Sequence, residues 1–147
     1  MKKLKKLLAC LLIMATMVSI IPIGASAEEN SGITPRYSNV NACSLSFIIS
    51  DNGLAQVKVA YEGRVGYMTQ VRSEIYLQKR VLGIFWKKVD IGVTDNVWVD
   101  TSTEDAYFFT HSAQLQDTGT YRAVFNVTFS GTGGADDVVN EKIEYVY

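Results

Sequence analysis

The sequence predicts an all-β fold, an antiparallel β-sandwich of seven to eight strands. Apolar and polar residues alternate with a period of two, most clearly from Tyr121 to Phe129, where every second residue is apolar. Turn signals rich in glycine, asparagine and aspartate separate the alternating runs at short intervals. No segment after residue 27 has helical periodicity. These observations favour a sandwich over a barrel or an α/β fold.

The alternating runs can be placed in order along the chain. The first covers residues 37–49 and is followed by the turn Asn52-Gly53, whose residues accept the positive φ of a tight hairpin. Glycines at positions 131, 133 and 134 mark a second hairpin loop. The other strands are expected at residues 54–61, 69–81, 84–91, 105–115, 121–130 and 137–147, with a short apolar piece at 97–99 inside the polar segment 92–105.

One face of each expected strand is apolar and should line the core, with Phe125 at its centre. The opposite faces are mostly polar, with Val124 as an apolar exception. The residues expected to face inward are Cys43, Leu45, Phe47, Ile49, Ala55, Val57, Val59, Tyr61, Val71, Ile75, Leu77, Phe85, Val89, Ile91, Tyr107, Phe109, Ala113, Leu115, Tyr121, Ala123, Phe125, Val127, Phe129, Val139, Ile143, Tyr145 and Tyr147.

The N-terminus has the order of parts of a secretory signal peptide. Lysines at positions 2, 3, 5 and 6 precede an apolar run over residues 7–23, and Ala25-Ser26-Ala27 follows it. Cleavage is expected after Ala27, which gives a secreted, extracellular product. An uncleaved membrane anchor is the alternative, but the run is about 17 residues long and spanning takes about 20. Residues 28–36 should form a flexible leader before a single domain, 37–147.

The expected secreted product is acidic. Four of the fourteen basic residues lie in the signal segment, so ten remain against fifteen acids, a net charge of −5. Nucleic acid and anionic membranes are bound by clustered lysine and arginine. We therefore expect neither nucleic acid nor, after signal cleavage, a membrane as a partner, and no cofactor is indicated.

Cys43 is the one cysteine of the expected secreted product, so no internal disulfide can form. An odd cysteine in an exported protein is either a reactive thiol or a partner in an intermolecular disulfide. Its alternation with Leu45, Phe47 and Ile49 instead favours a small buried apolar residue.

The segment Leu115-x-Asp117-x-Gly119-x-Tyr121-x-Ala123 resembles the tyrosine corner of immunoglobulin-like domains. In those domains the tyrosine hydroxyl bonds back to the corner backbone, and a strand cysteine follows two residues later. Tyr121 matches the corner tyrosine, whereas Ala123 stands at the cysteine position. The third strand has Ile75 or Leu77 where antibody domains have a core tryptophan. The resemblance therefore implies a broad immunoglobulin-like sandwich, not an antibody-type domain.

The chain also resembles a family of small secreted proteins of unknown function from Gram-positive bacteria. The shared features are the lysine-rich signal, the strand Ile75-Tyr76-Leu77-Gln78-Lys79, the turn at residues 83–86 and Gly119-Thr120-Tyr121-Arg122. They span most of the expected secreted product. The resemblance implies no particular activity.

His111, the one histidine, is the first residue to consider for catalysis. One histidine and one cysteine cannot supply the three or four ligands of a zinc site. A Ser-His-Asp triad stays open, although no Gly-x-Ser-x-Gly nucleophile elbow is present. We therefore assign no catalytic and no metal-binding residue, and favour a structural or surface role for His111.

An acidic segment follows the expected fourth strand and is a candidate for calcium. Calcium takes several oxygen ligands from flexible loops. The spacing matches no EF-hand, and strand-connecting loops are often acidic because they are solvated. The residues concerned are Asp95, Asn96, Asp100, Glu104 and Asp105.

Three aromatic residues are the candidate binding residues: Trp86, Trp98 and Tyr67. Ile84-Phe85-Trp86 lies beside Lys87-Lys88, and alternation should turn either Phe85 or Trp86 outward. Exposed aromatic side chains on a β-sandwich can stack on sugar rings or anchor a protein. The alternative is that Phe85 and one tryptophan belong to the core.

Three hypotheses for function follow. The first is a non-catalytic binding module that presents a loop or sheet surface to a protein or a glycan. The second is a small secreted hydrolase that uses His111 with a nearby acid and hydroxyl. The third is a surface or matrix component that self-associates weakly through its tyrosine-rich final strand.

Overall fold

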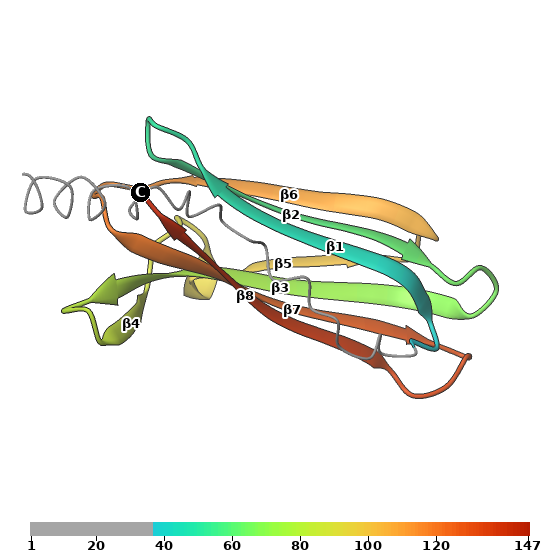
Figure 1. Cartoon of the computed structure of the whole chain (residues 1–147). Coiled ribbons are helices and arrows are strands. Elements are labelled where there is room, and N and C mark those ends of the chain that lie inside the picture. Colours follow the sequence, from blue (N-terminus) through green and yellow to red (C-terminus); the bar gives the residue numbers. More distant parts are fainter. Residues whose placement is uncertain (1–36) are drawn as a thin grey trace, which may run out of the picture. The chain divides into compact units, whose positions relative to one another are not determined.

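Residues 37–147 form two antiparallel β-sheets in the computed structural model, which describes this part of the chain (Figure 1). The predicted signal peptide and leader fall on residues 1–36, outside the described residues. The smaller sheet has three strands in the order β1-β2-β6. They are β1 (Val40–Ile49), β2 (Leu54–Gly63) and β6 (Ala106–Gln114).

The larger sheet has the order β4-β3-β7-β8, with β5 also paired to β3. Its strands are β3 (Met68–Val81), β4 (Phe85–Lys88), β5 (Trp98–Ser102), β7 (Thr120–Gly131) and β8 (Asp137–Val146). Strand β3 is 14 residues long, so two short strands share one of its edges. Strand β5 pairs with residues 71–75 of β3, and β4 pairs with residues 78–81. A short 3-10 turn, η1 (Thr94–Asn96), lies between β4 and β5.

Two elements differ from the sequence-based expectation. The strand expected at residues 84–91 ends at Lys88. The N–H of Val89 still donates to the carbonyl oxygen of Leu77 at 2.9 Å, and beyond it the chain leaves β3. It returns as β5, in the segment where only a short apolar piece was expected.

In the part of the chain that the structure describes, no helix is long and apolar enough to cross a membrane.

The alternation correctly predicted the centre of the core. Residues buried almost completely between the sheets include Val57, Val59, Ile75, Leu77, Phe125, Val127 and Phe129. Three residues expected to face inward are exposed instead, Phe85 at 63%, Tyr107 at 52% and Tyr145 at 37%. Phe85 belongs to β4, which packs mainly against β3. The smaller sheet therefore does not cover it, and alternation alone could not reveal this.

The predicted tyrosine-corner hydrogen bond is confirmed. The hydroxyl of buried Tyr121 donates to the carbonyl oxygen of Asp117 at 2.6 Å, which fixes the turn between β6 and β7. Gly119 lies inside this turn and exchanges two backbone hydrogen bonds with Tyr147, of 2.8 and 2.9 Å. The same corner therefore also holds the end of β8.

At the opposite end of the sandwich, Asp137 joins the two sheets. Its buried carboxylate accepts the backbone N–H groups of Ser38 at 2.8 Å, Asn39 at 2.5 Å and Val40 at 3.1 Å. These three residues lead into β1, whereas Asp137 begins β8 in the other sheet. Hydrogen bonds to an ionised acceptor are roughly twice as strong as neutral ones, so one side chain fixes the start of β1.

Asn39 completes this junction from the other side. Its fully buried side chain donates to the carbonyl oxygens of Phe129 and Ala135, and accepts the N–H of Gly133 at 3.1 Å. The end of β7 lies so close to the segment before β3 that a Cβ on Gly131 would collide with the carbonyl oxygen of Tyr67. The glycines predicted to form a hairpin turn are thus needed for this close approach.

We predict that Asp137→Asn lowers the free energy of unfolding by about 2–3 kcal/mol, because an amide replaces one accepting oxygen with a donor and leaves N–H groups unsatisfied in a buried site. The exposed neighbour Asp136 offers a matched control, and Asp136→Asn should change stability by less than about 0.5 kcal/mol. Urea unfolding followed by tryptophan fluorescence measures both. Equal stability of the two variants would contradict this role of Asp137.

Candidate functional site

The three candidate aromatic residues lie at separate places along β3. Tyr67 directly precedes this strand, Trp98 pairs with Ile75, and Trp86 pairs with Arg80 near the far end. At about 3.3 Å per residue, the positions of Trp98 and Trp86 are roughly 17 Å apart, and Tyr67 lies still further from Trp86. The three side chains therefore do not form one patch, and each has to be considered with its own neighbours.

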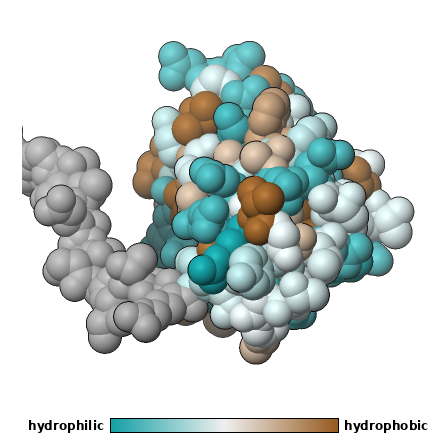
Figure 2. All heavy atoms as spheres, turned by 90° about the vertical axis from the view of Figure 1, so that its right-hand side faces the viewer, coloured by the Kyte–Doolittle hydropathy of each residue, from teal (hydrophilic) through white to brown (hydrophobic). Residues whose placement is uncertain are grey.

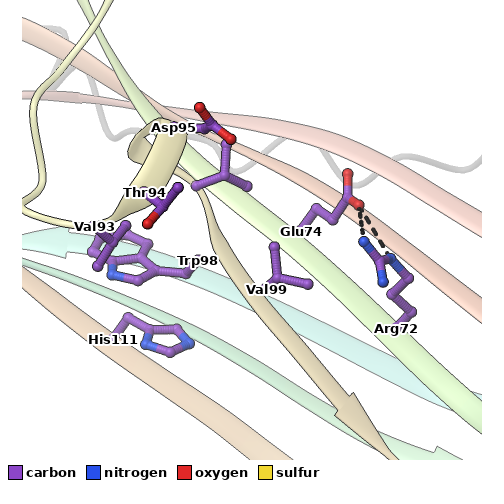
Figure 3. Close-up of a pocket in the computed structure, with 9 residues that line it drawn as sticks. Arg72, Glu74, Val93, Thr94, Asp95, Trp98, Val99 and His111 are labelled. Atoms are coloured by element: carbon purple, nitrogen blue, oxygen red, sulfur yellow. Dashed lines mark hydrogen bonds and ion pairs between the residues drawn. The ribbon is translucent and has the colours of Figure 1, made fainter.

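Trp98 lies at an open hollow of about 650 Å³ beside β5 (Figure 3). Strand β3 contributes two charged side chains to it, the segment around η1 and β5 contributes valines and polar groups, and β6 contributes His111. The residues that line the hollow are Arg72, Glu74, Val93, Thr94, Asp95, Val97, Trp98, Val99 and His111.

The outer part of the hollow combines an exposed apolar side chain with an ion pair. Val99 pairs with Glu74 across β5 and β3 and is 50% exposed. Glu74 accepts two hydrogen bonds through Oε1 from Arg72, from Nε at 3.1 Å and Nη2 at 2.7 Å (Figure 3). Arg72 and Glu74 are two residues apart on one strand, so both side chains project from the same face.

The inner part of the hollow is a packed junction between the sheets. His111 on β6 stacks on the indole of Trp98 with 5.1 Å between ring centroids and 7° between planes. Its Nε2 lies 2.7 Å from Oδ2 of Asp100 on β5. Trp98 is only 7% exposed. The indole therefore belongs to the contact between the sheets and does not offer an open face for stacking a sugar ring.

The His111–Asp100 pair resembles two members of a catalytic triad, in which the acid orients the imidazole. A triad also needs a nucleophile within hydrogen-bond reach of the second ring nitrogen. Within residues 37–147, no hydroxyl or thiol forms a hydrogen bond with His111. The contact with Asp100 therefore orients the imidazole of His111 and links β5 to β6.

The side chains of the acidic segment do not converge on one point. Asp100 is engaged by His111, and the side chain of Asn96 accepts the N–H of Ile91 at 3.1 Å. No three histidine, cysteine, aspartate or glutamate side chains of residues 37–147 converge as ligands for a metal ion. The carboxylates of this segment are thus spread along η1, β5 and the β5–β6 connection.

Trp86 lies on the hairpin formed by β3 and β4, among cationic side chains. The guanidinium carbon of Arg122 lies 4.1 Å from the centroid of the indole, and that of Arg80 lies 5.9 Å from it. Nearby, Nζ of Lys88 lies 4.8 Å from the ring centroid of Tyr76. The sequence placed Trp86 beside the lysines of β4. It did not reveal Arg122, which reaches the hairpin from β7 through the strand pairing.

The tip of this hairpin is apolar and exposed: Leu82 by 83%, Ile84 by 72% and Phe85 by 63%. The other end of the sandwich, which carries the β2–β3 and β7–β8 connections, has a different surface. Viewed from that end in Figure 2, hydrophobic residues are scattered among hydrophilic ones and form no continuous patch. An apolar tip with a cationic base is thus a local feature of the β3–β4 end.

Cys43 lies in a separate shallow hollow of about 280 Å³ between β1 and β8. Tyr37, Leu45, Val139, Glu141 and Ile143 line it together with the thiol. Burial raises the pKa of Cys43 from 9.0 to about 11. The thiol is free and partly buried, and it packs at the margin of the core, whereas full burial was expected.

No protein-family model matches this chain, and a search of curated proteins finds no match.

We predict that Cys43 reacts slowly in the folded protein. With a pKa near 11 instead of 9.0, the thiolate fraction at pH 8 falls by about 100-fold, and the rate of alkylation falls with it. Because the folded-state pKa is the higher one, stability is unaffected below pH 9 and decreases between pH 9 and 11. Iodoacetamide labelling of native and urea-unfolded protein tests this. Equal labelling rates would show that the thiol is accessible and ionisable.

Proposed function

We propose that this protein is a secreted, non-catalytic binding module, an immunoglobulin-like sandwich that presents its larger sheet to a partner protein. Export is supported by the lysines, apolar run and Ala25-Ser26-Ala27 of the N-terminal sequence. Binding is supported by the hollow beside β5. A glycan is the other partner class that the sequence suggested.

The immunoglobulin-like assignment rests on strand order as well as on Tyr121. If β1, β2, β3, β4, β6, β7 and β8 are given the letters A, B, C, C′, E, F and G, the sheets become A-B-E and C′-C-F-G. This is the division of strands between the sheets in immunoglobulin-like sandwiches. Strand β5 departs from that arrangement because it pairs with β3 and extends the larger sheet. No disulfide between β2 and β7 accompanies the fold, since Ala123 stands at the cysteine position.

The single observation that carries the binding proposal is the composition of the hollow. Ligand sites combine apolar surface with a few polar groups that fix orientation. Val93 and Val99 supply exposed apolar surface beside the Arg72–Glu74 pair. An exposed ion pair contributes at most about 1 kcal/mol to stability, so a partner can engage these charges without destabilising the fold.

A protein is favoured over a glycan because β5 is an edge strand. Among the described strands, β5 pairs with β3 alone. An edge strand has backbone donors and acceptors on its open side, and an extended segment of a partner can add to them. The buried indole of Trp98 also removes the stacking face that a sugar ring would use.

The hydrolase alternative has one observation in its favour, the 2.7 Å contact between His111 and Asp100. A contact of this kind also links the two sheets, and the stacking of His111 on Trp98 supports that second role.

Self-association through β8, an edge strand of the larger sheet, is a third proposal. Sedimentation at several protein concentrations distinguishes it from binding to a different partner.

The binding proposal is tested by screening the exported protein against arrays of extracellular proteins and glycans. We expect a protein ligand whose affinity falls at least about tenfold in Val99→Glu, because the substitution places a charge in an apolar contact. The matched control is Val138→Glu on β8, since Val138 is 52% exposed and Val99 is 50% exposed. The control should bind as the wild type does.

Three outcomes would contradict the proposal. The first is silence on the arrays. The second is equal binding by Val99→Glu and the wild type. The third is turnover of a substrate that His111→Ala abolishes and Val99→Glu leaves intact, which would establish the hydrolase alternative.

A further inference from the structure

We propose that the β3–β4 hairpin docks the protein on an anionic lipid bilayer. The apolar tip, Leu82, Ile84 and Phe85, enters the interface, and the lysines and arginines behind it contact lipid phosphates. This proposal goes beyond the function proposed above and uses residues outside the hollow beside β5. It also reverses the expectation, based on net charge, that the secreted product has no membrane partner.

The composition of the hairpin is the first observation. Residues 79–88 read Lys-Arg-Val-Leu-Gly-Ile-Phe-Trp-Lys-Lys, which includes four cations, no acid and no uncharged polar side chain. The chain as a whole has fifteen acids and fourteen basic residues. A stretch that is both purely cationic and otherwise apolar is what membrane-surface segments use against anionic lipids.

The second observation is that these residues form layers along the hairpin. Strand pairing places Val81 opposite Phe85, Arg80 opposite Trp86, Lys79 opposite Lys87 and Gln78 opposite Lys88. Starting from the tip, apolar residues come first, then tryptophan with arginine, then lysines. At about 3.3 Å per residue, Arg80 lies roughly 7 Å behind Leu82, a depth similar to the roughly 5–10 Å to which interfacial segments are buried.

Trp86 stands at the boundary between the apolar and cationic layers. Tryptophan is enriched at this depth in membrane proteins because its ring is apolar and its N–H is polar. The guanidinium groups of Arg80 and Arg122 lie near the indole, at 5.9 and 4.1 Å from its centroid. The two guanidinium groups therefore place positive charge at the same depth as the indole.

The third observation concerns the turn itself. Leu82 and Gly83 both have positive φ, 52° and 69°. Leu82 and Gly83 are the central residues of a β-turn closed by the N–H of Ile84 and the carbonyl oxygen of Val81. Asparagine and glycine suit a first central position with positive φ, and leucine is strained there. The chain thus keeps a large apolar side chain, 83% exposed, at a position where a polar one would fit the backbone better.

The hairpin is free to reach a flat surface. Strand β4 packs mainly against β3, and Figure 1 shows the β3–β4 hairpin extending away from the smaller sheet. Acidic residues lie near its base: Asp117, whose Oδ2 is 3.2 Å from Nζ of Lys79, Asp90, Asp95, whose carbonyl oxygen accepts from Lys88, and Glu144, which pairs with Arg122 across β8 and β7. They neutralise part of the innermost cationic layer. Arg80 and Lys87 have no carboxylate partner among the described residues.

A bilayer fits this surface better than an acidic protein does. The hairpin tip is convex, its cations lie on both strands, and residues 79–88 include no uncharged polar side chain to give directional recognition. In a lipid interface, hydrocarbon and phosphate lie in parallel planes. The apolar tip would meet the hydrocarbon and the cationic layer behind it would meet the phosphates. Binding to an acidic protein is the competing outcome of the test.

The test uses the exported protein and vesicle sedimentation. Equimolar phosphatidylcholine and phosphatidylglycerol vesicles should bind the wild type at least about tenfold more tightly than phosphatidylcholine alone, and high salt should abolish the difference. The double variant Leu82→Asn/Ile84→Ser should lose at least about tenfold in affinity, and Lys87→Glu about fivefold. Asparagine suits the positive φ of Leu82, so the double variant keeps a fold-compatible turn.

Two controls isolate the hairpin. Val65→Ser removes an apolar side chain of 73% exposure, which matches the 72% of Ile84, at the other end of β3. Val65→Ser and Val99→Glu should both bind vesicles as the wild type does, so failure of the lipid proposal and failure of the protein-partner proposal are distinguishable. Brominated lipid tails should quench tryptophan fluorescence in the wild type but not in Trp86→Phe, which retains the buried Trp98.

The proposal is overturned if the wild type binds neither vesicle or binds both equally, or if the double variant binds as the wild type does. It is also overturned if soluble polyphosphate or an acidic protein binds with a dependence on Lys87 but not on Ile84. That outcome would identify a polyanion, without hydrocarbon, as the ligand.

Discussion

The carboxylate of Asp137 imposes the arrangement of the two sheets, because it holds three backbone N–H groups of the segment that leads into β1. A buried carboxylate is costly unless its oxygens are satisfied, so this contact forms only when β1 and β8 are correctly placed. The Tyr121 hydroxyl plays the corresponding part at the other end, on the β6–β7 corner. The described residues include one free cysteine, so polar contacts, and no internal disulfide, fix the two ends of this domain.

The contacts of Asp137 and Tyr121 hold the two ends of the sandwich. One edge of β3 can therefore be paired with short strands only. Strands β4 and β5 each cover a few residues of it, and neither is required for the contact between Asp137 and β1. The apolar residues of the hairpin tip can therefore stay exposed without loosening the core around Phe125. The proposed binding residues are exposed side chains of β3, β4 and β5, whereas the buried residues of these strands, such as Ile75 and Trp98, belong to the core.

The sequence allowed the core to be predicted because burial in a two-layer fold follows alternation wherever both layers are present. Val57, Ile75 and Phe125 lie in that region, and all are buried. Alternation does not predict the burial of Phe85 and Trp98. Both lie on strands at the edge of the larger sheet, where a side chain is buried only if the smaller sheet extends over it. The contact of Arg122 with Trp86 depends on β4 and β7 flanking the same strand. Asp137 looked like an ordinary strand residue, because its three partners lie nearly 100 residues earlier.

Net charge is a poor guide to this surface because a membrane responds to charge within about one Debye length, roughly 8 Å at physiological ionic strength. The excess of acid is spread over the whole domain, whereas residues 79–88 carry four cations and no acid. Asp117 and Asp90 lie at the base of the hairpin, behind its tip, and Glu74, the acid of β3, is six residues from Arg80, or roughly 20 Å along the strand. The charge of Glu74 is screened at the hairpin tip, and the acids at the base leave Arg80 and Lys87 without a carboxylate partner among the described residues. An acidic protein can therefore present a cationic surface to a bilayer, provided that its basic residues are gathered at one protruding element.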